Sequence, residues 1–251
     1  MAAERNAARK RTARRFTLGT QSCTNTTNSS GVASCSIILN QTPGPYTVTA
    51  SFAGSGNYLA SSASVAFKIT QPPTITSANK TTFTTGSAST FTVTTTGYPI
   101  PALNKTGSLP SGVTFTDNGN GTATISGTPA AGTGGTYPIT ITASNGILPN
   151  ATQSFTLTID QPPHVTSLNY ATFIKGIANS FTVTTTGFPV PALRFSPAGS
   201  LPPGVTFVDN HNGTATISGK PTVSGLFTFW IETTNGVSPP GFESFSLTVK
   251  P

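Results

Sequence analysis

Apolar and polar residues alternate along most of the chain. In the stretches FTVT, starting at Phe91, and SFTLTI, starting at Ser154, every second side chain is apolar and the residues between are Thr or Ser. A period of two residues is what a β-strand with one buried face requires. Breaks rich in Gly, Pro and Asn separate such stretches at intervals of roughly 8–12 residues, as in antiparallel sandwiches. The pattern predicts an all-β chain with threonine-rich outer faces.

The chain contains an internal repeat. GVTFTDNGNGTATISGTP, residues 112–129, recurs as GVTFVDNHNGTATISGKP, residues 204–221, with three changes. PPTITS and FTVTTTGYPIPAL recur as PPHVTS and FTVTTTGFPVPAL at an offset of ninety residues. Such self-similarity marks structural units in series. We expect two complete units, 71–160 and 161–251, joined by Pro-Pro linkers that favour extended geometry and arrange the units as a rod.

The DNGNG and DNHNG segments predict tight turns. Each lies between two short alternating runs, and Asn, Asp and Gly accept the left-handed backbone that a hairpin turn needs. Asp117 and Asp209, which begin these segments, are therefore expected to form turns and not to act in catalysis.

Residues 16–70 differ from the two repeats. YTVTASFAGSGNYLASSASVAFKIT predicts two strands joined by a turn near Gly56, and a hairpin carrying both cysteines is expected before it. A sandwich built from so few strands would have a bare edge and an open core. We therefore expect a partial unit at 16–70, lacking its first strands and cut from a longer tandem array. A basic, disordered tail is expected at 1–15.

Cys23 and Cys35 are the only cysteines of the chain. They lie at equal distances from Ser29, so two strands folded about that residue would place them opposite each other, as a disulfide requires. Two free thiols are the alternative. Zinc is not expected, because no further ligands lie nearby. A disulfide would indicate an oxidising compartment.

Charge and composition exclude several classes of function. The net charge of +7 is concentrated in the first fifteen residues, and only 8% of all residues are charged. No basic patch continues beyond the tail, so specific nucleic-acid binding is not expected; a tail that binds phosphate backbones nonspecifically is the alternative. No apolar run is long enough to span a membrane, and no apolar signal-peptide core follows the tail.

Few side chains offer catalytic or metal-binding chemistry. His164 follows the second linker, His211 lies at a turn, and the first repeat contains no histidine. Paired acid–base catalysis is therefore not expected, and no catalytic residue is assigned. Calcium needs about 6–8 oxygen ligands, several of them carboxylates, and the linkers supply only Asp160. No metal site and no cofactor are expected, with calcium as the alternative.

Trp230 is the one side chain that suggests contact with a ligand. At the offset of ninety it matches Thr140, which lies between inward-facing positions, so Trp230 is expected on the outer face. An outward tryptophan can stack on a sugar or on a partner protein. The alternative is that it only covers the threonines beside it.

The stretch LPSGVTFTDNGNGTATISGTPAAGTGGTYPITITASNG and its second copy resemble the immunoglobulin-like repeats of bacterial surface and secreted proteins, a group related to cadherin-like modules. PGPYTVTASFAGSGNYLASSAS resembles the C-terminal part of another bacterial immunoglobulin-like repeat. The resemblance implies β-sandwiches in tandem outside the cell, serving as spacers, adhesion modules or companions of secreted enzymes. It supplies no catalytic residues.

These observations predict tandem immunoglobulin-like antiparallel β-sandwiches, arranged as a rod. The expected function is a non-enzymatic structural spacer or adhesion segment of a larger secreted or cell-surface bacterial protein. Its expected partners are neighbouring repeats and a host or polysaccharide surface. The alternative is a carbohydrate-binding accessory module of a secreted hydrolase.

Overall fold

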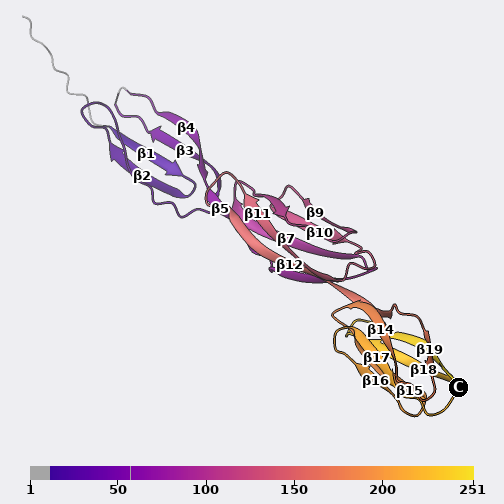
Figure 1. The fold of residues 1–251 in the computed structure, drawn as a ribbon. Helices are drawn as coiled ribbons and strands as arrows, with labels where there is room; N and C mark the ends of the chain where they lie inside the picture. The colour runs from indigo at the N-terminus through magenta and orange to yellow at the C-terminus, as the bar shows by residue number, and fades with distance from the viewer. Residues whose placement is uncertain (1–11, 57) are drawn as a thin grey trace, which may run out of the picture. The chain divides into compact units, whose positions relative to one another are not determined.

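The computed structural model describes residues 12–56 and 58–251, in which all regular structure is β-strand (Figure 1). Most strands of the two repeats alternate between inward apolar and outward polar side chains, as the period of two predicts. Within the described residues, no helix has the length and apolar character needed to span a membrane.

The first sheet is formed by β1 (Ala13–Leu18), β2 (Gln21–Thr26), β3 (Gly44–Phe52) and β4 (Ser61–Ile69). Its antiparallel strands lie in the order β2-β1-β3-β4. Val48 of β3 is paired with Val65 of β4, and Tyr46 is paired with Phe67, so apolar side chains share one face. Val65 is nevertheless 64% exposed. The described residues of this segment form this one sheet and leave most of β4 open to solvent.

Two details of this segment differ from the sequence-based expectation. Strand β1 begins at Ala13, so Arg14 and Arg15 belong to the sheet and not to a tail. Arg14 is paired with Asn25 of β2, and its guanidinium carbon lies 4.2 Å from the centroid of the Phe52 ring. The disorder expected for residues 1–11 lies outside the described residues.

The prediction that the two cysteines lie on one hairpin is also wrong, although the disulfide between them is present. Cys23 and Cys35 are bonded, with their Cα atoms 6.2 Å apart. Cys23 lies on β2, but Cys35 lies in irregular chain between β2 and β3. Strand β2 pairs instead with β1, about a turn at Gly19, so the disulfide attaches a loop to the sheet and does not link two strands.

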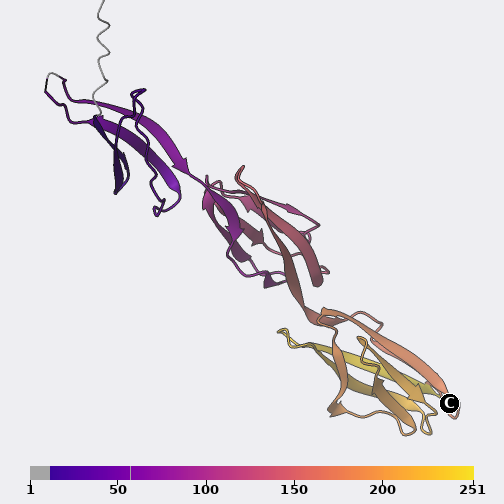
Figure 2. The ribbon, with the colours of Figure 1, turned by 90° about the vertical axis from the view of Figure 1, so that its left-hand side faces the viewer.

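Residues 72–160 form a sandwich of two sheets (Figure 2). One sheet has the order β5-β7-β10-β9, and in the other β12 pairs with β6 and β11, and β11 with β8. The strands are β5 (Gln71–Ile75), β6 (Lys80–Thr84), β7 (Ser89–Tyr98), β8 (Ala102–Thr106), β9 (Val113–Asp117), β10 (Thr122–Gly127), β11 (Gly135–Ser144) and β12 (Ala151–Val165).

Residues 161–251 repeat this architecture. The first sheet has the order β16-β17-β14-β12 and the second has the order β13-β19-β18-β15. The strands that follow β12 are β13 (Tyr170–Ile174), β14 (Asn179–Phe188), β15 (Ala192–Gly199), β16 (Val205–Asp209), β17 (Thr214–Gly219), β18 (Gly225–Thr234) and β19 (Gly241–Lys250).

Strand β12 belongs to both repeats. Its residues Thr156–Asp160 pair in parallel with β6, and its residues Gln161–Val165 pair antiparallel with β14. The Pro162-Pro163 linker is therefore part of a strand. Proline has no N–H to donate to a ladder, and the register of the β12–β14 pair shifts between Gln161 and His164, where the two prolines lie.

Apolar side chains from both sheets fill the interior of each repeat. In the second repeat Phe229 and Phe245 are almost fully buried, with ring centroids 5.3 Å apart. Phe181 lies 5.2 Å from Phe245, and Phe91 lies 5.2 Å from Phe155 at the matching place in the first repeat. Full burial of each such ring contributes about 1.5–3 kcal/mol, so these contacts stabilise the two cores in the same way.

Close backbone contacts explain why glycine stands at both ends of the GVTF…ISG segment in each repeat. Gly112, in the turn just before β9, lies beside Gly127 of β10, and a Cβ atom on Gly127 would lie 2.0 Å from the carbonyl oxygen of Gly112. Gly204 and Gly219 meet in the same way in the second repeat, where the corresponding distance is 2.1 Å. Both glycines of each pair also have positive φ, which other residues adopt at a cost.

Candidate functional site

The two aspartates at the hairpin turns have structural roles. The carboxylate of Asp117 accepts hydrogen bonds from the backbone N–H of Gly119, at 3.0 Å, and from that of Leu103 on β8, also at 3.0 Å. Asp209 accepts from His211 and Leu193 in the same arrangement. Each carboxylate therefore shapes its own turn and ties that turn to the opposite sheet. The expectation that these aspartates form turns is confirmed.

An asparagine in each repeat joins three segments of the chain, and sequence reasoning missed it. Asn145 donates from Nδ2 to the carbonyls of Gln71 and Pro99, and its Oδ1 accepts from the N–H of Ile147. Asn235 makes the same three bonds, to Gln161, Pro189 and Val237. The only signal in the sequence is that the dipeptide Asn-Gly occurs at the same place in both repeats.

The histidines and the linker aspartate do not gather at one place in the fold. His164 is exposed on β12 opposite Thr186, and Asp160 is paired with Thr84 of β6. His211 lies at the hairpin tip, where its Nδ1 is 3.4 Å from the carboxylate of Asp209. In the part of the chain that the structure describes, no three His, Cys, Asp or Glu side chains gather as ligands for a metal ion.

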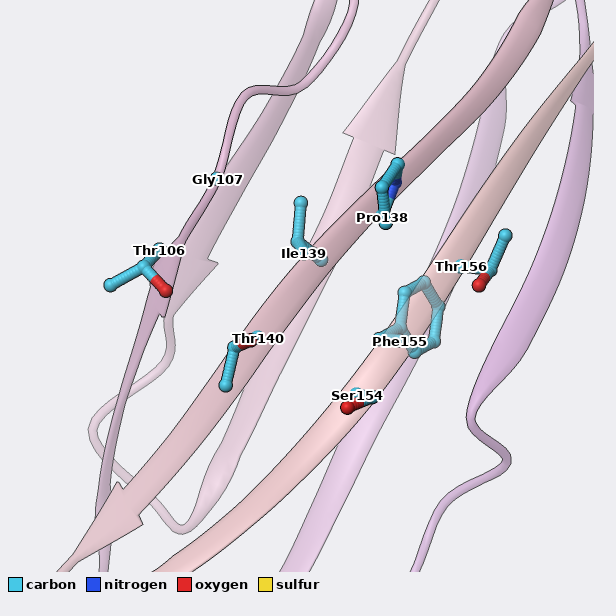
Figure 3. A pocket seen from close by; sticks show the side chains of 8 residues that line it. All are labelled: Thr106, Gly107, Pro138, Ile139, Thr140, Ser154, Phe155 and Thr156. Atoms are coloured by element: carbon cyan, nitrogen blue, oxygen red, sulfur yellow. The ribbon is translucent and has the colours of Figure 1, made fainter.

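A shallow depression lies on the outer face of the sheet formed by β8, β11 and β12 (Figure 3). Its volume is ≈ 220 Å³, and four of its eight lining residues carry hydroxyl groups. Thr140 and Ser154 lie on the neighbouring strands β11 and β12, as the figure shows. The lining residues are Thr106, Gly107, Pro138, Ile139, Thr140, Ser154, Phe155 and Thr156.

The same face of the second repeat carries Trp230. Its neighbours along β18, Phe229 and Ile231, are fully buried, whereas Trp230 is 42% exposed. Trp230 is paired with Ser196 of β15 and with Ser244 of β19. At the offset of ninety, Trp230 and Ser244 correspond to Thr140 and Ser154, so the indole stands where the first repeat has its depression.

Further residues on this face were not identified from the sequence. Phe242 of β19 and Tyr170 of β13 are 55% and 57% exposed, and they lie on the outer face with Trp230. Arg194 and Glu232 form an ion pair there, with 2.9 Å between Arg194 Nε and a carboxylate oxygen of Glu232. An alignment of the two repeats could have revealed Tyr170 and Phe242, because the first repeat has Lys80 and Thr152 at the matching positions.

Comparison with known proteins identifies the fold. Residues 72–160 match the family model described as "Putative Ig domain". A search of curated protein sequences found no match.

Among solved structures, the chain is similar to the I-band fragment I67–I69 of titin. The TM-score is 0.53 at 15% sequence identity, with 83% of this chain and 75% of the titin chain covered. An E-to-A variant of the same three-domain fragment gives a TM-score of 0.54 at 13% identity, covering 94% of this chain and 87% of that chain. At these identities the similarity shows the fold alone.

The sheet orders agree with these matches. In each repeat one four-stranded sheet packs on a second sheet whose outer strand runs parallel to the last strand, an arrangement of immunoglobulin-like sandwiches. The chain therefore carries immunoglobulin-like domains in tandem, and its residues 72–160 match the model of the family described as "Putative Ig domain".

Proposed function

We propose that this chain is a non-enzymatic structural spacer that bears tension within a larger secreted or cell-surface bacterial protein. The observation that carries the proposal is the parallel pairing of an early and the last strand in both repeats. Strand β6 pairs with β12 over Lys80–Thr84, and β13 pairs with β19 over Tyr170–Ile174.

This pairing determines how a repeat responds to a pull on its two ends. Because β13 and β19 are parallel, a pull on the chain before β13 and after β19 draws the two strands past each other along their axes. The ladder is then loaded in shear, with its hydrogen bonds sharing the force. An antiparallel hairpin pulled at its open end would instead lose its bonds one after another.

The disulfide and the resemblance to bacterial surface repeats support a location outside the cell. Cys23 and Cys35 are bonded, and disulfides persist mainly in oxidising compartments. Neighbouring repeats of the parent protein are the partners that a tandem spacer requires. The extended arrangement expected from the Pro-Pro linkers remains a prediction.

The shear ladder can be tested by two proline substitutions in β13. Ser246 N–H donates to Asn169 O, and Lys175 N–H donates to Lys250 O. Because parallel ladders alternate, the N–H of Ala171 faces β19, whereas that of Thr172 faces the open edge of the sheet. Ala171→Pro removes a rung of the ladder, and Thr172→Pro is the matched control.

We expect Ala171→Pro to lower the force at which the second repeat unfolds in single-molecule pulling of the full chain. Thr172→Pro should leave that force close to the wild-type value. Equal unfolding forces for wild type and Ala171→Pro, with both folded, would contradict the proposed role of the β13–β19 ladder.

A further inference from the structure

We propose that the outer face of the β13-β19-β18-β15 sheet binds an uncharged polysaccharide. The inference goes beyond the spacer function and does not depend on it. The residues that carry it are Tyr170, Trp230 and Phe242, together with the hydroxyl side chains between them. We call this surface the aromatic face.

Strand register brings the aromatic side chains onto one surface. Phe242 is paired with Glu232, and Ser244 is paired with Trp230, so Phe242 and Trp230 are diagonal neighbours on adjacent strands. Diagonal neighbours lie roughly 7–8 Å apart, within reach of aromatic side chains. Tyr170 is paired with Ser246 on the other side of β19. Three rings are thus distributed across three adjacent strands.

The spaces between the rings are polar and nearly neutral. Ser196 and Ser244 flank Trp230 across the sheet, and the Arg194–Glu232 ion pair adjoins it on the next row. The guanidinium is largely exposed, so its remaining N–H groups can meet an incoming acceptor. Among the described residues of this face, the other charged side chain is that of Lys250, at the end of β19.

This combination matches the chemistry of a neutral sugar chain. The C–H faces of sugar rings are apolar and can lie on aromatic rings, while their hydroxyls donate to and accept from serine, guanidinium and carboxylate groups. Since the ion pair is internally neutral, the face has little net charge with which to attract an acidic or basic polymer.

A second copy of the same face would fit less well. Two such faces packed together would bury the Arg194–Glu232 pair and the serine hydroxyls without adequate partners, which costs free energy. A polyhydroxylated ligand instead provides hydrogen bonds at those places. The polysaccharide therefore satisfies both the rings and the polar groups.

The first repeat shows that the fold does not need these rings. At the offset of ninety, Tyr170, Trp230 and Phe242 correspond to Lys80, Thr140 and Thr152. The strand orders and the core are nevertheless the same in both repeats. The rings therefore need an explanation other than folding.

The first repeat also supplies the substitutions for a test. Trp230→Thr and Phe242→Thr install the residues that this fold already carries at Thr140 and Thr152. Val208→Thr is the matched control, because Val208 is exposed on β16 of the other sheet and corresponds to Thr116. Thermal melts of all three variants establish that they are folded.

Binding by the full chain can be measured in two ways. Affinity electrophoresis in gels containing β-glucan, xylan, mannan or α-glucan detects retardation by a neutral polymer. Because Trp230 is the only tryptophan, a change in its fluorescence on titration reports contact at this face directly. We expect retardation and a fluorescence change with at least one neutral polymer. We expect on the order of tenfold weaker binding for Trp230→Thr and for Phe242→Thr, and no change for Val208→Thr.

Several outcomes would overturn the proposal. These are the absence of binding to all four neutral polymers, binding to acidic polymers alone, or binding that Trp230→Thr leaves intact. A concentration-dependent dimer in sedimentation velocity that Trp230→Thr abolishes would show that a second copy covers the face instead. None of these results would bear on the unfolding forces that test the spacer function.

Discussion

His211 occupies a backbone position that its counterpart fills with glycine. Its φ is 58°, and Gly119 at the matching turn of the first repeat has a φ of 71°. Residues with a Cβ pay roughly 1–2 kcal/mol in the left-handed region, whereas glycine pays none but loses more entropy on folding. His211 is thus a locally unfavourable residue in an otherwise repeated turn.

We expect His211→Gly to raise the free energy of unfolding of the second repeat by roughly 0.5–1 kcal/mol, because the strain at this φ is relieved. Urea unfolding followed by Trp230 fluorescence measures it. The reciprocal control is Gly119→Ala, which should destabilise the first repeat by a similar amount; it is followed by circular dichroism, because the only tryptophan lies in the second repeat. A destabilising His211→Gly would show that the 3.4 Å contact between His211 and Asp209 outweighs the backbone strain.

Asn235 holds together segments that are distant in sequence. Its amide bonds to backbone groups of Gln161, Pro189 and Val237 at 2.8, 2.9 and 3.1 Å. Removal of the side chain leaves two carbonyls and one N–H without these partners, and the loss is costly at the part-buried groups of Gln161 and Val237.

We expect Asn235→Ala to lower the free energy of unfolding by about 2–3 kcal/mol. The exposed Asn104 on β8 is the control, and Asn104→Ala should change stability by less than about 0.5 kcal/mol. Urea titrations of both variants provide the measurement. Equal effects of the two substitutions would mean that the three bonds of Asn235 add nothing beyond surface solvation.

Among the elements, the strands and turns of the repeats could be predicted because they depend on local pattern. Alternation of Phe, Val and Ile with Thr is sufficient for β7 or β11, and Asn-Gly is sufficient for the hairpin turns. The linker could not be predicted as a strand. Pro162 and Pro163 break the ladder pattern, and only the pairing of β12 with both β6 and β14 shows that the strand continues through them.

The strand pairing of the cysteine segment was also hard to predict, because it depends on contacts that the local sequence pattern does not contain. Equal spacing about Ser29 is compatible with a hairpin, but the residues around Cys35 lack the alternation that would hold a strand in a sheet. Strand β1 supplies the partner for β2 instead. The arginines of β1 resemble a tail by charge, but the pairing of β1 with β2 and β3 places them in the sheet, where Arg14 also lies over the Phe52 ring.

The candidate site was predictable only at Trp230. Its outward direction follows from the neighbours on its own strand, Phe229 and Ile231. Tyr170 and Phe242 lie far from it in sequence, and their proximity depends on the register of β13, β19 and β18. The bonds of Asn235 likewise join residues 46 and 74 positions away, which no local pattern contains.

Among the elements of the first sheet, we expect the disulfide to stabilise β1 and β2. It closes a short loop with a sequence separation of 12, for which chain-entropy arguments give about 2–3 kcal/mol. We expect the double variant Cys23→Ala, Cys35→Ala to speed hydrogen exchange at the amides of β1 and β2. Amides of β18 and β19 serve as the internal control and should not change. Unchanged exchange in β1 and β2 would show that the sheet does not rely on the disulfide.

For the whole molecule, the two repeats are complete sandwiches with separate cores, and each has a parallel pair that a pull would shear. A spacer made of such domains should yield one domain at a time. Each unfolding event should then release the length of one repeat, since about ninety residues extend to roughly 30 nm at 3.3–3.6 Å per residue.

The most direct test is to pull single molecules of the full chain by its two ends. We expect two unfolding peaks of similar force per molecule, each followed by a length gain of roughly 30 nm. A single event that releases both repeats together, or gradual extension without force peaks, would contradict a tension-bearing spacer of independent immunoglobulin-like domains.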